Sequence, residues 1–192
     1  MKLISNHIQN SINALENLKT KSKQIEKIFK LIEKKIKSGK KIFVYGNGGS
    51  FADASHFVGE LTATYNKKGR KGLPFYLLSS NLSSVTAWSN DFNFKDYVSR
   101  ELSCYAQKGD MVIILSTSGG NLKNQQSLNL IKLAKNAIKN SVYVISLLGK
   151  GGGELKKISN KCIIVNSNNT ANIQELHKVI YHSICSYLER KF

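Results

Sequence analysis

Apolar residues recur at helical spacing through the first 38 residues of the chain. They form one series from Ile4 to Leu18 and a second from Ile25 to Ile36. Positions three and four apart share one face of a helix, so the pattern predicts one or two amphipathic helices, with a weak break between Lys19 and Lys23.

Five short apolar runs follow, rich in β-branched and aromatic residues. They are KIFVY (41 to 45), PFYLLS (74 to 79), MVIILS (111 to 116), VYVISLL (142 to 148) and CIIVN (162 to 166). Most of them are apolar at consecutive rather than alternate positions, which is typical of strands buried on both faces of a parallel sheet.

Helical patterns fill the gaps between these runs, at about 50 to 64, 94 to 107, 122 to 139 and 170 to 190. Alternating strands and helices predict a doubly wound α/β fold, in which helices cover both faces of a five-stranded parallel sheet in a three-layer α/β/α sandwich. Ligands of such folds bind beyond the carboxyl ends of the strands. The loops that begin at Gly46, Ser79, Ser116 and Leu148 are therefore the candidates for a binding site.

The chain has 192 residues, enough for one sizeable core, and no linker divides it. We expect a single domain over residues 1–192, with residues 1–38 as a helical extension. The sequence has neither the continuous apolar start of a signal peptide nor a run of about 18 apolar residues, which favours a cytoplasmic protein without a membrane partner. Its three cysteines are widely spaced and predict free thiols rather than disulfides.

The net charge of +17 raises the possibility of a nucleic-acid partner. The basic residues are mostly lysines scattered over helical segments, with arginines only at positions 70, 100 and 190. We therefore expect solvated helix faces that attract an anionic substrate, and no nucleic-acid partner.

The first predicted strand leads through Gly46, Asn47, Gly48, Gly49 and Ser50 directly into a helix. Glycines allow positive φ and close backbone approach, and the first turn of a helix offers unpaired N–H groups, so the segment could bind an anion. It matches neither a dinucleotide fingerprint nor a Walker loop, and a plain tight connection is the alternative.

The third strand ends in a second loop of this kind, Ser116-Thr117-Ser118-Gly119-Gly120-Asn121. Its hydroxyls and glycine amides can donate to phosphate oxygens, although serine turns that cap a helix have the same composition. Two such loops at one sheet edge, without a Walker lysine, favour a sugar phosphate as the ligand.

Two histidines and a glutamate are candidates for the chemistry. His56 and Glu60 lie one turn apart on the helix that the glycine loop opens, and so share a face. Gln174 and His182 follow on the last helix, separated by a rise of about 12 Å, which is awkward for two ligands of one metal ion. A surface pair or a satisfied core histidine is the alternative reading of His56 and Glu60.

A string of motifs in one order resembles the sugar isomerase domain family. The motifs are GNGGS-x-x-D-x-x-HF-x-x-EL, the pair Asn90-Asp91, STSG, KGGGEL and TA-x-IQE-x-H-x-x-x-x-H, and they cover nearly the whole chain. The resemblance implies a flavodoxin-like sheet and an aldose–ketose isomerase that converts sedoheptulose 7-phosphate into D-glycero-D-manno-heptose 7-phosphate through an enediol. Its product would enter the biosynthesis of nucleotide-activated heptose for lipopolysaccharide or capsule.

The resemblance also implies a set of site residues. One zinc ion per subunit would be bound by His56, Glu60, Gln174 and His182, with Glu60 and His182 catalytic. Substrate contacts would come from Asn47, Gly48, Gly49, Ser50, Glu60, Asn90, Asp91, Ser116, Thr117, Ser118, Asn121 and Gln174. Members of the family are homotetramers whose N-terminal helices form the interface and whose active sites lie between subunits.

The chain departs from the family pattern at three places. Asn121 stands where the family usually has serine, and Thr64 stands where an arginine is common, which leaves Lys67, Lys68 or Arg70 as substitutes. Asn172 replaces the arginine of the TAR motif. Two other functions stay open: a non-catalytic relative that binds a protein partner such as a replication initiator, and an isomerase of another sugar phosphate.

Overall fold

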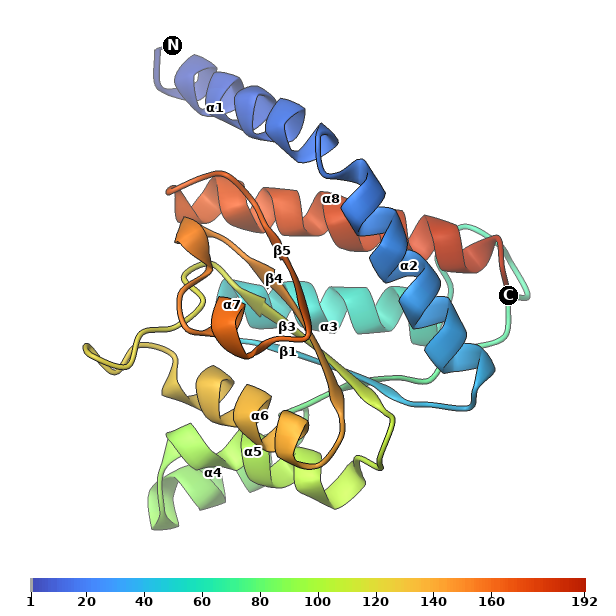
Figure 1. The fold of residues 1–192 in the computed structure, drawn as a ribbon, viewed down its shortest axis with the longest axis vertical. Helices are drawn as coiled ribbons and strands as arrows, with labels where there is room; N and C mark the ends of the chain where they lie inside the picture. Colours follow the sequence, from blue (N-terminus) through green and yellow to red (C-terminus); the bar gives the residue numbers. More distant parts are fainter. Residues whose placement is uncertain (1) are drawn as a thin grey trace.

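The computed structural model describes residues 2–192, which form a three-layer α/β/α sandwich around one parallel sheet (Figure 1). The five predicted strands are all present, in the order β2-β1-β3-β4-β5. They are β1 (Ile42–Gly46), β2 (Phe75–Leu77), β3 (Met111–Ser116), β4 (Tyr143–Leu148) and β5 (Lys161–Ile164). Gly46 pairs with Leu115, and Ser116 with Leu148, so β1, β3 and β4 end at the same edge of the sheet.

Two apolar clusters form the core, one on each face of the sheet. In β1, Ile42 and Val44 belong to one cluster, while Phe43 and Tyr45 belong to the other. Successive side chains of a strand point to opposite faces, and here both faces are covered. This burial on both sides is why the strands are apolar at consecutive positions.

Each face of the sheet carries its own helices (Figure 1). One face is covered by α2 (Ser22–Lys37), α3 (Gly49–Thr62) and α8 (Thr170–Glu189). The other is covered by α5 (Phe94–Tyr105), α6 (Leu128–Lys139) and the short α7 (Leu155–Ile158), which follows a 3-10 turn at Lys150–Gly152.

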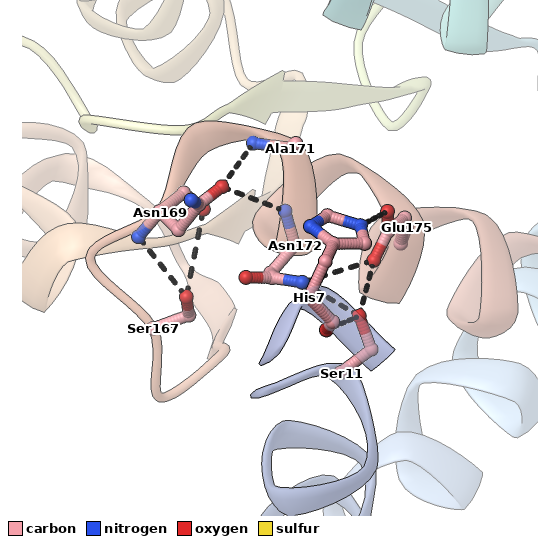
Figure 2. A network of polar contacts seen from close by, with 7 residues as sticks. All are labelled: His7, Ser11, Ser167, Asn169, Ala171, Asn172 and Glu175. Carbon is pink, nitrogen blue, oxygen red and sulfur yellow. Dashed lines mark hydrogen bonds and ion pairs between the residues drawn. The ribbon is translucent and has the colours of Figure 1, made fainter. Parts of the chain in front are cut away.

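The first helix, α1 (Lys2–Lys19), lies outside these layers and packs against α8 (Figure 1). A polar network joins the two helices: His7 Nε2 is 2.7 Å from Glu175 Oε1, and the Ser11 hydroxyl donates to Glu175 Oε2 over 2.7 Å. The buried Asn172 amide donates to Ser11 Oγ (Figure 2). The docking of α1 thus combines this network with the buried side chains of Ala14 and Leu18, which join the core.

The outward face of α1 is apolar. Its exposed side chains are Leu3, Ile4, Ile8, Ile12 and Leu15, with 40% to 89% of each accessible to solvent. The predicted break between the first two helices is confirmed, because α1 ends at Lys19 and α2 begins at Ser22.

Two predictions of local structure were wrong. Residues 122–127, expected to be helical, form a loop that extends away from the body of the molecule (Figure 1, yellow). The side chains of Asn121 and Asn124 accept from the backbone N–H groups of Lys123 and Gln126, so they offer the backbone an alternative to a helix. A helix that the sequence pattern did not predict, α4 (Leu82–Asp91), packs on α5 and buries none of its residues fully.

None of the helices within residues 2–192 combines the length and the apolar character that a membrane span requires.

Candidate active site

The glycine loop turns from β1 into α3 as the sequence predicts. Gly48 has φ +53° at the N-terminal cap of α3, and no side chain caps the helix there. A Cβ atom at Gly49 would lie 2.1 Å from Nε2 of Gln174. The side chain of Gln174 therefore lies directly against Gly49, and a larger residue there would require Gln174 to move.

The serine loop lies at the same sheet edge, after β3. Ser116 Oγ accepts from the N–H of Gly119 over 3.0 Å, and Ser118 Oγ accepts from that of Gly120 over 3.3 Å. This is the serine-turn geometry that the sequence left open as the alternative. A hydroxyl that accepts one bond still has a proton to donate, so both serines can contact a phosphate oxygen as well.

The segment KGGGEL braces the serine loop from behind. The N–H of Leu155 donates to the carbonyl of Gly119, and that of Glu154 donates to the carbonyl of Gly120. A Cβ atom at Gly119 would approach the carbonyl oxygen of Gly152 to 2.0 Å. The two glycine-rich segments therefore pack backbone against backbone, which fixes the position of the serine loop.

A cavity of about 440 Å³ opens beside the glycine loop, between β1 and the start of α6. It is lined by Asn47, Asn93, Phe94, Lys95, Gln125, Ser127, Leu128 and Asn129. The amide groups of Asn47 and the buried Asn129 donate to each other, over 3.0 and 2.7 Å. Asn129 thereby fixes the orientation of Asn47, one of the predicted substrate contacts.

Ser127, and not Asn121, is the residue that stands at the start of α6. Backbone pairing between Asn121 and Gln126 closes the loop of residues 121–126, so that Ser127 is the residue at the start of α6 and lines the cavity. Its φ is +55° and its side chain makes no capping bond.

His56, Glu60 and His182 converge as predicted. One ligand atom from each lies within 4.8 Å of the other two. His56 Nε2 is 2.8 Å from Glu60 Oε1, and the rings of His56 and His182 meet edge to face with centroids 5.2 Å apart. The three side chains are partly exposed, so a ligand can reach them from solvent. We call these three residues the triad.

Further polar groups lie beside the triad: Tyr181 and Asp53, which are buried, and Lys178, which is exposed. The Tyr181 hydroxyl is 3.1 Å from His56 Nδ1 and donates to Asp53 Oδ1 over 3.4 Å, while Lys178 Nζ is 3.8 Å from the same carboxylate oxygen. Burial raises the pKa of Tyr181 and, against the pull of Lys178, that of Asp53. Burial, with the neighbouring His56, lowers the pKa of His182 and favours its neutral ring.

The triad and the glycine loop lie apart within one chain. His56 and Glu60 follow Gly49 by seven and eleven residues, a rise of about 10 and 16 Å along α3. Gln174 lies against Gly49, at the glycine loop. A single chain thus has the triad toward one end of α3 and the two candidate anion-binding loops, residues 46–50 and 116–121, at the other. We call these two loops the cradle.

The remaining predicted residues have other surroundings. Asn90 and Asp91 lie exposed in the last turn of α4, where the amide of Asn90 donates to Asp91 Oδ1. The guanidinium of Arg70 is buried and donates to the backbone carbonyls of Glu60, Leu61 and Lys71. Arg70 therefore closes the carboxyl-terminal end of α3, directly behind Glu60.

Sequence reasoning missed four residues of this region: Asp53, Tyr181, Ser127 and Asn129. Asp53 lies one turn before His56 on α3, a spacing that could have marked it. Tyr181 stands among aliphatic residues, so its pattern is that of a core residue. Ser127 and Asn129 carried no signal, because the loop before them was read as helix.

Comparisons with known proteins show which proteins share this sequence and this fold. Residues 6–149 match the model of the SIS domain. The chain is 40% identical to the probable phosphoheptose isomerase of Thermoplasma acidophilum over 88% of its own length and 90% of that protein's. It is 38% identical to the phosphoheptose isomerase of Helicobacter hepaticus over 97% and 92% of the two chains. The structure of a phosphoheptose isomerase from Francisella tularensis superposes with a TM-score of 0.91 at 27% identity, over 98% and 97% of the chains.

Proposed function

The chain belongs to the SIS domain family, and we propose that it is the aldose–ketose isomerase that converts sedoheptulose 7-phosphate into D-glycero-D-manno-heptose 7-phosphate. The convergence of His56, Glu60 and His182 carries this proposal. The protein would act in the cytoplasm, and its product would feed the synthesis of nucleotide-activated heptose for lipopolysaccharide or capsule.

The reaction moves a proton between C1 and C2 of the sugar and needs a base beside those carbons. Glu60 is the carboxylate of the triad, and its single pairing with His56 leaves its other oxygen available to take and return the proton. His182, whose lowered pKa favours a neutral ring, can accept or donate a proton at the sugar oxygens. A non-catalytic relative has no need of this cluster.

The triad also fits a zinc ion, because imidazole nitrogens and a carboxylate oxygen are ligands that zinc accepts. Zinc ligands lie about 2.1 Å from the ion and therefore at most about 4.2 Å apart, so a separation of up to 4.8 Å needs only small side-chain rotations. Bound zinc would supply a Lewis acid that polarises the carbonyl oxygen. Three ligands from one chain leave a coordination position for substrate, and Gln174 as a further ligand would require a second subunit.

The phosphate end of the substrate would bind at the cradle. The loop amides of Gly48 and Gly49, with the hydroxyls of Ser116, Thr117 and Ser118, supply donors without any nucleotide motif. We add Ser127 to this set in place of Asn121, because it lines the cavity at the uncapped start of α6. Asn47, Ser50, Gln174, Asn90 and Asp91 remain the proposed contacts to the sugar.

A homotetramer with active sites between subunits would bring a cradle and a triad together. Two observations support it: the separation of about 10 Å along α3, and the exposed apolar face of α1. Replacing Ile8 by lysine should yield a smaller species in light scattering after gel filtration, while exchange of the exposed Lys2 for glutamine should not. An unchanged mass for Ile8→Lys would remove α1 from the interface.

The test of function is incubation of the purified protein with sedoheptulose 7-phosphate, with detection of the aldose phosphate. Glu60→Gln preserves the shape but removes the base, and it should abolish turnover in a protein that stays folded. The exposed Glu26 on α2, changed to glutamine, serves as the control and should retain full activity. Near-normal turnover by Glu60→Gln would contradict the role of Glu60, and turnover of a different sugar phosphate alone would contradict the heptose assignment.

A further inference from the structure

We infer that Tyr181 and Asp53 are positioning residues that hold His56 in the one tautomer that can bind a metal ion. The inference rests on the proposed function, since it concerns the metal that the triad would bind. Neither residue belongs to the triad, and both act through the ring nitrogen of His56 that faces away from it.

The two nitrogens of His56 have different surroundings. Nε2 faces Glu60 Oε1 at 2.8 Å and is therefore the nitrogen available to an ion between the triad residues. Nδ1 faces the hydroxyl of Tyr181 at 3.1 Å. A metal ligand must be an unprotonated nitrogen, so the ring proton has to lie on Nδ1 when the ion is bound.

A hydroxyl can satisfy that requirement because it both accepts and donates. Tyr181 would accept the proton of His56 Nδ1 and donate its own proton to Asp53 Oδ1, which is 3.4 Å away. The result is a chain from carboxylate to phenol to imidazole. Histidine ligands of metals usually donate their second N–H to such a partner, and loss of the partner weakens metal binding.

The phenol is held rigidly for this task. Tyr181 is fully buried, and its ring stacks on Phe57 with centroids 5.2 Å apart. A buried hydroxyl costs free energy unless it is hydrogen-bonded, so a position needed only for packing would be filled as well by phenylalanine. The charged groups that face Asp53 are Lys178 at 3.8 Å and, when they are protonated, His56 and His182, so the carboxylate is partly neutralised and still able to accept from the phenol.

Without an ion, Nε2 of His56 can donate to Glu60 Oε1 instead. When an ion takes that place, the remaining ring proton lies on Nδ1, where the Tyr181 oxygen accepts it while Tyr181 keeps its own bond to Asp53. Tyr181→Phe would leave the Nδ1–H of His56 without this partner.

The experiment compares zinc binding by the wild type and by Tyr181→Phe, using competition with a chromophoric chelator at neutral pH. We expect the zinc dissociation constant to rise by about 10- to 100-fold in the variant. The matched control is Tyr187→Phe, which also removes a phenol from α8, one that donates to Glu33 instead. The control should bind zinc as tightly as the wild type, and Asp53→Asn, which retains an acceptor without the charge, should lie between the two extremes.

A second readout separates positioning from a general loosening of the fold. In the zinc-loaded wild type labelled with ¹⁵N-histidine, the Nδ1–H proton of His56 should exchange slowly with water and be visible by NMR. In Tyr181→Phe, loaded with excess zinc, that signal should be lost while the backbone spectrum is retained. The chain has only four histidines, which keeps the spectrum simple.

Unchanged zinc affinity of Tyr181→Phe, or a protected Nδ1–H signal in that variant, would overturn the inference. A wild type that binds no zinc would overturn both the inference and the metal site. Zinc binding that responds as expected in a protein without isomerase activity would leave the inference standing and count against the proposed function alone.

Discussion

The buried ring of His177 should make the stability of the fold depend on pH. His177 lies on α8, is fully buried, and neither of its ring nitrogens makes a full hydrogen bond. Burial lowers the pKa of His177 from 6.5 to about 4, and the nearby carbonyl of Leu148 offsets only a part of that effect. The folded protein therefore keeps the ring neutral at a pH where the unfolded chain would protonate it.

The magnitude follows from the two pKa values. Below pH 6.5 the unfolded state takes up a proton that the folded state does not bind until about pH 4, so stability falls as the pH falls between these values. Each pKa unit corresponds to about 1.4 kcal/mol, which gives about 3 kcal/mol for the whole interval and about 2 kcal/mol between pH 7.5 and pH 5. For a chain of this length, 2 kcal/mol corresponds to about 4 to 8 °C in the melting temperature.

The perturbation is His177→Leu, which removes the titrating group and keeps a similar volume. Near pH 7.5 the variant should be at least as stable as the wild type, because leucine buries no unpaired polar atoms. Near pH 5 its melting temperature should exceed that of the wild type by a further 4 to 8 °C or so. The assay is thermal unfolding of metal-free protein at one fixed protein concentration, since an oligomer melts in a concentration-dependent way.

Leu176→Met is the matched control, because it perturbs packing on the same helix and leaves every titrating group in place. Its difference from the wild type should be the same at both pH values. A difference between His177→Leu and the wild type that does not grow on acidification would refute the reasoning.

Three further predictions concern the cradle and the metal. In thermal unfolding, Gly119→Ala should destabilise the fold by more than about 2 kcal/mol, because the new Cβ would meet the carbonyl oxygen of Gly152. The control is Gly151→Ala. Gly151 has a similar φ but open space around it, so this change should cost only about 1 kcal/mol. Asn129→Ala should raise the KM for the sugar phosphate by about tenfold, since it frees the amide of Asn47; an unchanged KM would show that Asn47 needs no support. Chelation should lower isomerase activity and added zinc should restore it, and full activity in protein shown to be metal-free would reject the metal.

The strands were predictable because most of them are apolar at consecutive positions, a pattern typical of burial on both faces of a sheet. The helix α4 was not predictable from apolar spacing, because it buries none of its residues fully and lies on α5 rather than on the sheet. The start of α6 was predicted wrongly for a local reason. Asparagine side chains accept hydrogen bonds from the backbone and favour a loop over residues 121–126.

The candidate site, too, was only partly predictable from the sequence. The spacing of His56 and Glu60 placed both on one face of a helix, since residues four apart always share one. That His182 joins them depends on how α3 packs on α8, which no local pattern encodes, and here it was expected from the family resemblance alone. Tyr181 could not be assigned, because a buried tyrosine has the same sequence signature whether its hydroxyl has a partner or not, whereas Asp53 could have been found from its spacing to His56.

The loop of residues 121–126 is closed at its base, so a change in its length need not move the residues on either side of it. Asn121 pairs with Gln126 at the base of the loop, so its two ends stay together whatever lies between them. We expect this segment to accept an inserted peptide tag, a protease cleavage sequence or a fluorescent label without displacing Gly120 or Ser127. The protein thus offers an attachment point for immobilisation and labelling close to its binding cavity.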